Sequence, residues 1–481
     1  MIYYILEGHE FNNEVQTGIQ IFYPLEKYSR VEEISSEGIT VLSRIEEDFS
    51  LCRVYEAGKL ICEKKLDKPH SENIKEEKSR TKEAVYFALS ELTRYQPPWG
   101  ILTGIRPTKL TEEFYSEGLS HDEAVEAFRK RYYVKENKAS LAVSVYDREK
   151  AILDSSRNGS WSLYAGIPFC ASRCLYCSFT SYPVDRYKNK IDKYIDCLIK
   201  EFEFTGTKLN DPETIYIGGG TPTALNEAQL DRMLSALEEN FDTQGASEFT
   251  VEAGRPDTIT EEKLEILKKH NVSRISVNPQ TMNDKTLRLI GRRHTVSQIK
   301  ETFFLAREKG FDNINMDLIL GLPGEDLKDV RHTFSEIENL SPDSLTVHTL
   351  AVKRASDLRG TLEKFPLAAS EEIEKMLDIS ADFAKKLNMN PYYMYRQKNM
   401  LGSFENVGYS REGKESLYNI KIMEETQSII ALGAGGVTKT VDRKTGRIER
   451  IFNVKSADDY IERIDEMLER KEKGLNLEVI L

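Results

Sequence analysis

The chain has 481 residues, 40% of them hydrophobic and 30% charged, so it is long enough for two or three domains with full-sized cores. Its formal net charge of −12 excludes an overall basic field of the kind that attracts nucleic acid or an anionic membrane. No apolar run approaches the ~20 residues of a membrane span, and the N-terminus lacks the pattern of a signal peptide. We therefore expect a cytoplasmic protein whose thiols stay reduced.

Residues 1–150 are predicted to form an α+β accessory domain. The stretches "ITVLSRI" and "SLCRVYEAGKLICEKKL" have the composition of strands, and a helix is expected over about 75–95. The polar run over 67–82 joins them and is most simply solvated surface.

Residues 151–351 show strands and helices in alternation. Six strands separated by helices predict a parallel sheet with right-handed crossovers, curled into a full or partial (β/α)6 barrel of the α/β class. The expected strands are 161–169, 214–220, 248–254, 274–280, 313–322 and 344–350, and the expected helices are 185–204, 226–241, 260–271, 283–291, 296–310 and 326–340. Such a sheet gathers functional residues at the C-terminal ends of its strands.

Residues 352–481 are predicted to form a mixed, largely helical extension. Helices are expected over 369–387 and 456–473, and the aromatic and cationic stretch "YYMYRQKN" lies between them. Its tyrosines either receive a flat, acidic ligand or simply close the side of the barrel.

The loop after the first core strand carries three of the six cysteines, Cys170, Cys174 and Cys177. This C-x3-C-x2-C spacing lets three thiols converge on one metal centre. A structural zinc site normally has four protein ligands, whereas a [4Fe–4S] cluster held by three cysteines leaves one iron open to a chelating small molecule. A zinc site completed elsewhere and three inert core thiols are the alternatives. Cys52, Cys62 and Cys197 lack this spacing and are expected to be small buried hydrophobes.

Polar or glycine-rich groups follow the next strands at or near their ends. "GGGTP" (218–222) ends the second strand, and its glycines would let the backbone approach a ligand, although a tight turn is the simpler explanation of this motif taken alone. Glu252 could hold ribose hydroxyls, and Asp317 is a carboxylate within an apolar strand that needs a partner. Gln280 ends the fourth strand, and Arg292 lies in "GRRHT" beyond it. Together these groups predict a pocket for a nucleoside amino acid.

Residues 162 to about 351 resemble the core of the radical S-adenosylmethionine (SAM) superfamily, specifically its oxygen-independent coproporphyrinogen III oxidase-like group. The motifs that carry the resemblance are "IPFC" with the cysteine loop, "GGGTPT", "GRRHT" and "DLILGLPGE". "ALGAGGVTKT" (431–440) is similar to a late glycine-rich segment of that group. "PPWGILTGIRPTKL" (97–110) and "YYMYRQKNMLGSFENVGYS" (392–410) resemble its HemZ branch, the coproporphyrinogen dehydrogenases.

The resemblance implies roles for individual residues. Cys170, Cys174 and Cys177 would ligate a [4Fe–4S] cluster. The residues that would contact SAM are Tyr164, Tyr176, Gly219, Gly220, Thr221, Glu252, Gln280, Arg292, Asp317, Ala351 and Val437.

The implied reaction is the oxidative decarboxylation of two propionates of coproporphyrinogen III, giving protoporphyrinogen IX. An external electron donor such as flavodoxin or ferredoxin would reduce the cluster. Trp99 and Arg106 could guide a propionate, with a structural turn as the simpler explanation. The chain departs from the decarboxylases at Gly166, where they carry His, and at Phe179, where they carry a fourth Cys. The heme chaperones of the group also lack that cysteine, so a heme-binding chaperone is the main alternative. A SAM-dependent methyltransferase or heme-degrading enzyme is a third.

Overall fold

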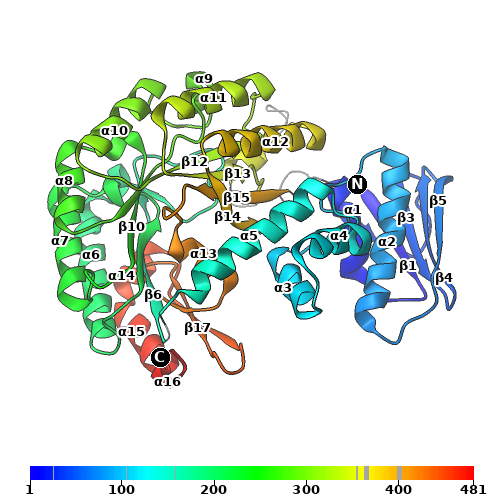
Figure 1. Cartoon of the computed structure of the whole chain (residues 1–481), viewed down its shortest axis with the longest axis horizontal. Helices are drawn as coiled ribbons and strands as arrows, with labels where there is room; N and C mark the ends of the chain where they lie inside the picture. The colour runs from blue at the N-terminus through cyan, green and yellow to red at the C-terminus, as the bar shows by residue number, and fades with distance from the viewer. Residues whose placement is uncertain are drawn as a thin grey trace. The chain divides into compact units, whose positions relative to one another are not determined.

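The computed structural model describes residues 1–24, 26–104, 106–157, 159–353, 356–361, 368–397 and 404–480 (Figure 1). The chain divides into two compact units. The first contains Met1–Tyr146, Ala369–Glu374 and Tyr395–Glu405, and the second contains Asp147–Ala368, Lys375–Met394 and Asn406–Leu481. Over the described residues, no helix is long and apolar enough to cross a membrane.

The first unit is built on a mixed sheet with the strand order β2-β1-β3-β4-β5. Its strands are β1 (Ile2–Glu7), β2 (Tyr28–Arg30), β3 (Ile39–Ile45), β4 (Phe49–Glu56) and β5 (Lys59–Asp67). Its helices are α1 (Asn12–Phe22), α2 (Ile74–Thr93), α3 (Thr108–Ser116), α4 (His121–Tyr132) and the start of α5 (Glu136–Asp154). Val15 and Ile19 of α1 share an apolar core with Val85 and Leu89 of α2 and with the sheet. The α+β class predicted for this region is confirmed.

The helix expected at 75–95 is α2, which begins where the Asn73 side chain accepts a hydrogen bond from the Lys75 amide. The helices α3 to α5 were not among the predicted elements. A local signal for one of them exists, because Ser120 and Glu123 form a reciprocal capping box at the start of α4. Short amphipathic helices of this kind depend on tertiary packing more than on intrinsic propensity.

The second unit contains the predicted α/β core. Its long sheet has the strand order β14-β15-β13-β12-β11-β10-β9-β6-β16-β17-β18. The six central strands are parallel and follow one another in chain order: β6 (Trp161–Ile167), β9 (Thr214–Gly219), β10 (Glu248–Gly254), β11 (Arg274–Val277), β12 (Ile314–Leu320) and β13 (Ser344–Thr349). Within this unit, the connecting helices form an arc around the strands (Figure 1). These helices are α6 (Val184–Gly206), α7 (Glu227–Asn240), α8 (Glu261–Lys269), α9 (Asp284–Leu289), α10 (Val296–Glu308) and α11 (Leu327–Leu340).

All six predicted core strands are therefore confirmed, and all but β10 end one to three residues earlier than predicted. Strand β11 stops at Val277, three residues before the predicted end, because Gln280 adopts a left-handed backbone conformation with φ of 67°. Gln280 instead forms an isolated parallel bridge with Leu318 of β12.

The C-terminal residues extend the sheet on both sides. The added strands are β14 (Asn390–Arg396), β15 (Glu405–Ser410), β16 (Ser428–Leu432), β17 (Val437–Val441) and β18 (Ile448–Phe452). The added helices are α12 (Ser370–Lys386), α13 (Leu417–Glu424), α14 (Ala457–Glu462), α15 (Ile464–Gly474) and α16 (Leu477–Ile480). The single helix predicted over 456–473 is wrong in detail, because Arg463 leaves helical geometry and divides it into α14 and α15.

Tyr392–Arg396 of the "YYMYRQKN" stretch lie in β14 at the edge of the sheet, where Tyr392 and Tyr393 are buried. This placement favours a structural role for these tyrosines, while the following residues 398–403 lie outside the described part of the chain. Trp99 in the first unit is also buried, and its indole N–H donates to Glu405 at 2.6 Å. A ligand cannot reach its ring, so the structural explanation holds for Trp99.

Candidate functional site

The three clustered cysteines lie on the loop that leaves the C-terminal end of β6. Cys170 closes the short strand β7 (Phe169–Cys170), which pairs with β8 (Tyr182–Pro183) and so joins the two ends of the loop. The Cys177 amide donates to the Cys174 carbonyl at 3.0 Å in a tight turn. Cys174 is buried, whereas Cys170 and Cys177 are partly exposed. The pairing of β7 with β8 therefore closes the loop that carries the three thiols.

The donor set, three thiols on one short loop, has the chemistry of an iron–sulfur cluster site. Within the described residues, no group of three or more His, Cys, Asp or Glu side chains is arranged to hold one metal ion. In a [4Fe–4S] cluster each cysteine binds a different iron, so the thiolates need not converge on a point. Burial raises the pKa of the Cys170 thiol to about 11, so in the metal-free loop Cys170 is a neutral thiol that must lose its proton when metal binds.

Close backbone packing joins the glycine-rich turn to the cysteine loop. The register pairs Gly166 with Gly218 and Ile167 with Gly219, and the Thr221 amide donates to the Phe169 carbonyl at 2.7 Å. A Cβ at Gly220 would lie 2.6 Å from the Ile167 carbonyl oxygen, so no other residue fits there. The Thr221 hydroxyl lies 3.5 Å from the Cys170 sulfur. The glycines thus allow the glycine-rich turn to pack against the cysteine loop. From the sequence alone, this packing role could not be told apart from close approach of the backbone to a ligand.

Glu252 lies beside this turn at the end of β10. Its carboxylate accepts from the Tyr216 hydroxyl at 2.5 Å and from the Gly219 amide at 3.1 Å. Burial raises the pKa of Glu252 to about 7, and the nearby charge of Asp317 adds to the rise. Glu252 has no ion pair with any described residue, so a ligand that offers hydroxyl groups or positive charge would compensate it.

Gln280, three residues beyond the end of β11, lies against Asp317 of β12. The Gln280 amide donates to the Asp317 carbonyl at 2.9 Å. The side-chain Oε1 of Gln280 is buried and has no hydrogen-bond partner among the described residues. Asn315 donates to the Asp317 carboxylate at 2.7 Å, and His348 lies 3.9 Å from it. Burial would raise the pKa of Asp317, but His348 and Asn315 hold it below its usual value. The unpartnered Gln280 oxygen is the kind of acceptor that a bound ligand satisfies.

Arg292 connects the strand ends with the cysteine loop. Its guanidinium is buried and donates to the Tyr176 hydroxyl at 3.2 Å and to the Asn278 carbonyl. The side chain of Tyr176 is therefore oriented by Arg292. The remaining predicted residues lie toward the two ends of the row of parallel strands, Ala351 just after β13 and Val437 at the start of β17.

A fully buried charge network fixes the turn before Val437. Gly433 donates to Glu201 at 2.7 Å, and Glu201 also contacts the ammonium of Lys471 and accepts from Tyr460. A Cβ at Gly433, where φ is 90°, would lie 2.5 Å from the Gly166 carbonyl oxygen. This network holds the turn against the end of β6 and places Val437 beside it.

Tyr216, Tyr418 and Arg255 escaped prediction from sequence. Tyr216 and Tyr418 stack with the predicted Tyr164, with ring centroids 4.5 to 6.3 Å apart, and the period-two alternation of β9 could have placed Tyr216 on the same face as Tyr164. Arg255, two residues before Asp257 in "GRPD", donates to Ser172 of the cysteine loop. No sequence pattern indicates that contact.

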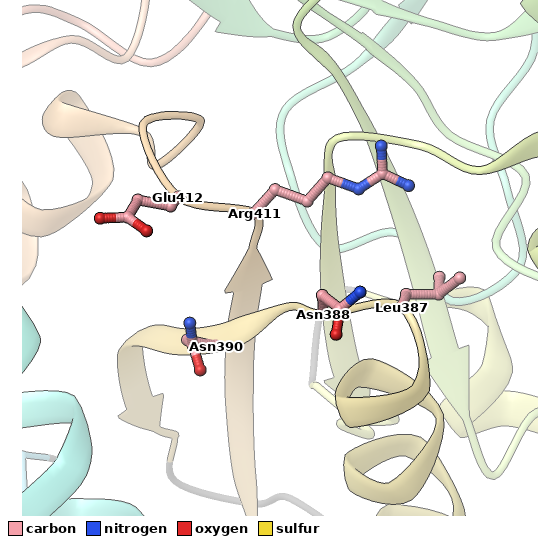
Figure 2. Close-up of a pocket in the computed structure, with 5 residues that line it drawn as sticks. All are labelled: Leu387, Asn388, Asn390, Arg411 and Glu412. Carbon is pink, nitrogen blue, oxygen red and sulfur yellow. The ribbon is translucent and has the colours of Figure 1, made fainter.

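A separate pocket of about 620 Å³ is lined by Leu387, Asn388, Asn390, Arg411 and Glu412 (Figure 2). Glu412 points away from the guanidinium of Arg411 (Figure 2). Ser410, next to Arg411, pairs with Ser344, the first residue of β13. This pocket therefore lies at the N-terminal edge of the parallel strands, opposite the cysteine loop.

Comparisons with known proteins agree with this arrangement. The Radical SAM superfamily profile matches residues 164–337. The chain is 44% identical over 384 residues to the oxygen-independent coproporphyrinogen-III oxidase-like protein HemZ of Bacillus subtilis, covering 78% of this chain and 77% of the relative. It is also 33% identical over 291 residues to the heme chaperone HemW of Bacillus subtilis, covering 58% and 73%. The solved structure of coproporphyrinogen III oxidase (HemN) from Escherichia coli matches with a TM-score of 0.52 at 23% identity, covering 66% of this chain and 72% of that one.

The fold and the sequence match define a radical SAM protein, and a [4Fe–4S] cluster and SAM are the cofactors of that superfamily. Within it, the chain belongs to the family of oxygen-independent coproporphyrinogen III oxidase-like proteins that includes HemZ.

The first prediction concerns the metal ligands. Replacing Cys170, Cys174 or Cys177 with Ala should abolish iron incorporation during anaerobic reconstitution, because each thiolate would bind one iron of the cluster. The matched controls are Cys52→Ala and Cys197→Ala, whose thiols are buried elsewhere and should leave iron content and thiolate-to-iron absorption unchanged. Iron loss in the control variants alone would contradict the assignment.

The second prediction concerns the buried carboxyl of Glu252. In the cofactor-free protein its pKa is about 7, above the value of about 4.3 expected when unfolded. The folded state therefore retains a proton that the unfolded state loses, so stability falls as the pH rises from about 4.5 to 7. Glu252→Gln should remove this decline, worth roughly 3 kcal/mol, from denaturant unfolding curves measured between pH 5 and pH 8. If the free energy of unfolding depended on pH in the same way in the parent and the variant, the Glu252 carboxyl would not be protonated in the folded protein.

Proposed function

We propose that the protein catalyses the oxygen-independent oxidative decarboxylation of coproporphyrinogen III to protoporphyrinogen IX in heme biosynthesis. The 44% identity to HemZ over most of both chains supports the family context. The observation that carries the proposal is the cysteine loop. It lies against the polar ends of the parallel strands, and it carries an exposed aromatic ring, Phe179, with the cations Arg173 and Lys353 near it in sequence or in space.

The mouth of the loop suits a flat, acidic macrocycle. Phe179 is 67% exposed, although a large apolar side chain is normally buried. The ammonium of Lys353 lies 5.9 Å from the centre of its ring, and Arg173 of the loop is exposed nearby in sequence. Aromatic faces stack on planar rings, and cations pair with carboxylates. We assign Phe179 to the tetrapyrrole face, and Lys353 and Arg173 to its propionates.

The chain's own residues would bind and orient both molecules. When bound, the cluster and SAM supply a carbon-centred radical able to remove hydrogen from an unactivated carbon. Cys170, Cys174 and Cys177 would hold the cluster, while Glu252, Gln280 and Asp317 would orient the nucleoside through its polar groups. Each propionate would then give one hydrogen atom to that radical and one electron to an external one-electron acceptor and would lose carbon dioxide, leaving a vinyl group. Tyr418 of the tyrosine stack is buried, so its ring helps to exclude water from this edge.

This proposal includes an organisation of the chain. Residues 1–150 would serve as an accessory domain, 151–351 as the catalytic core, and 352–481 as the region that closes on the substrate. An external donor such as flavodoxin or ferredoxin would supply the electron, and the reaction would take place in the cytoplasm.

The second candidate is a heme chaperone that retains the fold without decarboxylation. The 33% identity to HemW favours it, as does Gly166, where decarboxylases carry a His. The Gly166 carbonyl accepts a hydrogen bond from the Tyr194 hydroxyl at 2.7 Å. Gly166 itself has no side chain that could transfer a proton. Phe179, in place of a fourth cysteine, is compatible with both candidates.

The third prediction separates the two candidates. Reduced, cluster-loaded protein incubated without oxygen with SAM and coproporphyrinogen III should give vinyl products, with 5′-deoxyadenosine formed in proportion, as measured by mass spectrometry. The proportion matters because an enzyme couples SAM cleavage to hydrogen removal from its substrate.

In the same assay, Phe179→Ala should raise the KM for the tetrapyrrole about fivefold, equivalent to roughly 1 kcal/mol of lost stacking. Iron content and SAM binding should stay unchanged. Deoxyadenosine formation without vinyl products, together with tight heme binding, would reject the decarboxylase and support the chaperone.

A further inference from the structure

Arg255 is a buried cation between β10 and the cysteine loop. It follows the last residue of β10 and is only 3% exposed. Its Nε and Nη2 donate to the two carboxylate oxygens of Asp257, at 2.9 and 2.7 Å. Its Nη1 points the other way and donates to the carbonyl and hydroxyl oxygens of Ser172, at 3.1 and 2.7 Å. The guanidinium thus joins a fixed carboxylate to the cysteine loop.

The carboxylate partner is itself held in place. The Nδ1 of His294 lies 3.3 Å from Asp257. Burial would raise the pKa of Asp257, but hydrogen bonds from His294 and Arg255 hold it well below its usual range. Asp257 is therefore charged at neutral pH, and Arg255 and Asp257 form an oriented ion pair whose positive end faces the loop.

Ser172 lies between Cys170 and Cys174, so Arg255 acts on the segment that spaces two of the thiols. The Ser172 hydroxyl also donates to the Gly291 carbonyl at 3.1 Å, which ties this segment to the turn before Arg292. Arg255 therefore places a buried positive charge against the segment between two thiols proposed as cluster ligands.

We propose that Arg255 and Asp257 are positioning residues that set the reduction potential of the cluster held by Cys170, Cys174 and Cys177. The proposal rests on the proposed function only in that these cysteines hold the cluster. Three thiolates give the oxidised site a net negative charge, and reduction adds one more. A buried cation facing the loop favours the reduced form and raises the potential, whereas the carboxylate behind it lowers the potential.

This account predicts shifts of opposite sign for the two partners. Arg255→Gln should move the midpoint potential to a more negative value, because the positive end of the pair is removed. Asp257→Asn should move it to a less negative value, because the guanidinium keeps its charge and loses its counter-charge. Arg255→Lys should lie between the parent and Arg255→Gln. A merely structural role would move both partners' variants in the same direction or in neither.

The experiment uses the full chain, reconstituted anaerobically with iron and sulfide and studied without SAM or substrate. Iron content is measured first, and the midpoint potential is then determined by redox titration followed by electron paramagnetic resonance. Arg293→Gln is the matched control, because Arg293 is the exposed neighbour of Arg292 and its charge is screened by solvent. Its potential should equal that of the parent.

Shifts of the same sign in Arg255→Gln and Asp257→Asn, or no shift in either, would overturn the proposal. If Arg255→Gln does not assemble a cluster, the sign of the Asp257→Asn shift decides alone. A parent protein that assembles the cluster but does not decarboxylate the tetrapyrrole would contradict the proposed function and leave this test intact.

Discussion

The parallel pairing of six consecutive strands is the constraint on which the site depends. Because β6, β9, β10, β11, β12 and β13 run in one direction, their C-terminal ends meet at one edge of the sheet. The pairing of Ile167 with Gly219 sets the start of the cysteine loop beside the glycine-rich turn. If the pairing of these strands slipped by one residue, the side chains near their C-terminal ends would point to the opposite face of the sheet. The register therefore determines which side chains form the site.

The carboxylates at this edge of the sheet differ in how well neighbouring groups compensate their negative charge. This difference indicates which of them can bind a ligand. Asp257 is compensated by Arg255 and His294, and Asp317 lies near His348 and Asn315. Among the described residues, the Glu252 carboxyl accepts from a tyrosine hydroxyl and a backbone amide and has no ion pair, and burial raises its pKa to about 7. A carboxyl without an ion pair and a buried Gln280 oxygen without a partner, both among the described residues, are poor structural arrangements and good ones for binding a polar cation.

The sequence predicts the core better than its surroundings. The six core strands follow from short apolar runs bounded by glycine and polar residues, which are local signals. The division of 456–473 at Arg463 and the burial of Tyr392 depend on packing that local patterns do not encode. The same holds within the site: Glu252 and Asp317 stand at predictable strand positions, whereas Tyr216 contacts Glu252, and Arg255 contacts Ser172, across 36 and 83 residues.

Calorimetry of SAM binding, performed anaerobically on the cluster-loaded protein, tests most directly whether the strand ends and the cysteine loop form one site. Asp317→Ala removes a carboxylate that is not a proposed metal ligand, so iron content should equal that of the parent. Losing one charge-assisted hydrogen bond costs roughly 1.5–3 kcal/mol, so SAM affinity should fall by about tenfold or more. Unchanged affinity in a variant with full iron content would show that SAM binds elsewhere and would contradict the account.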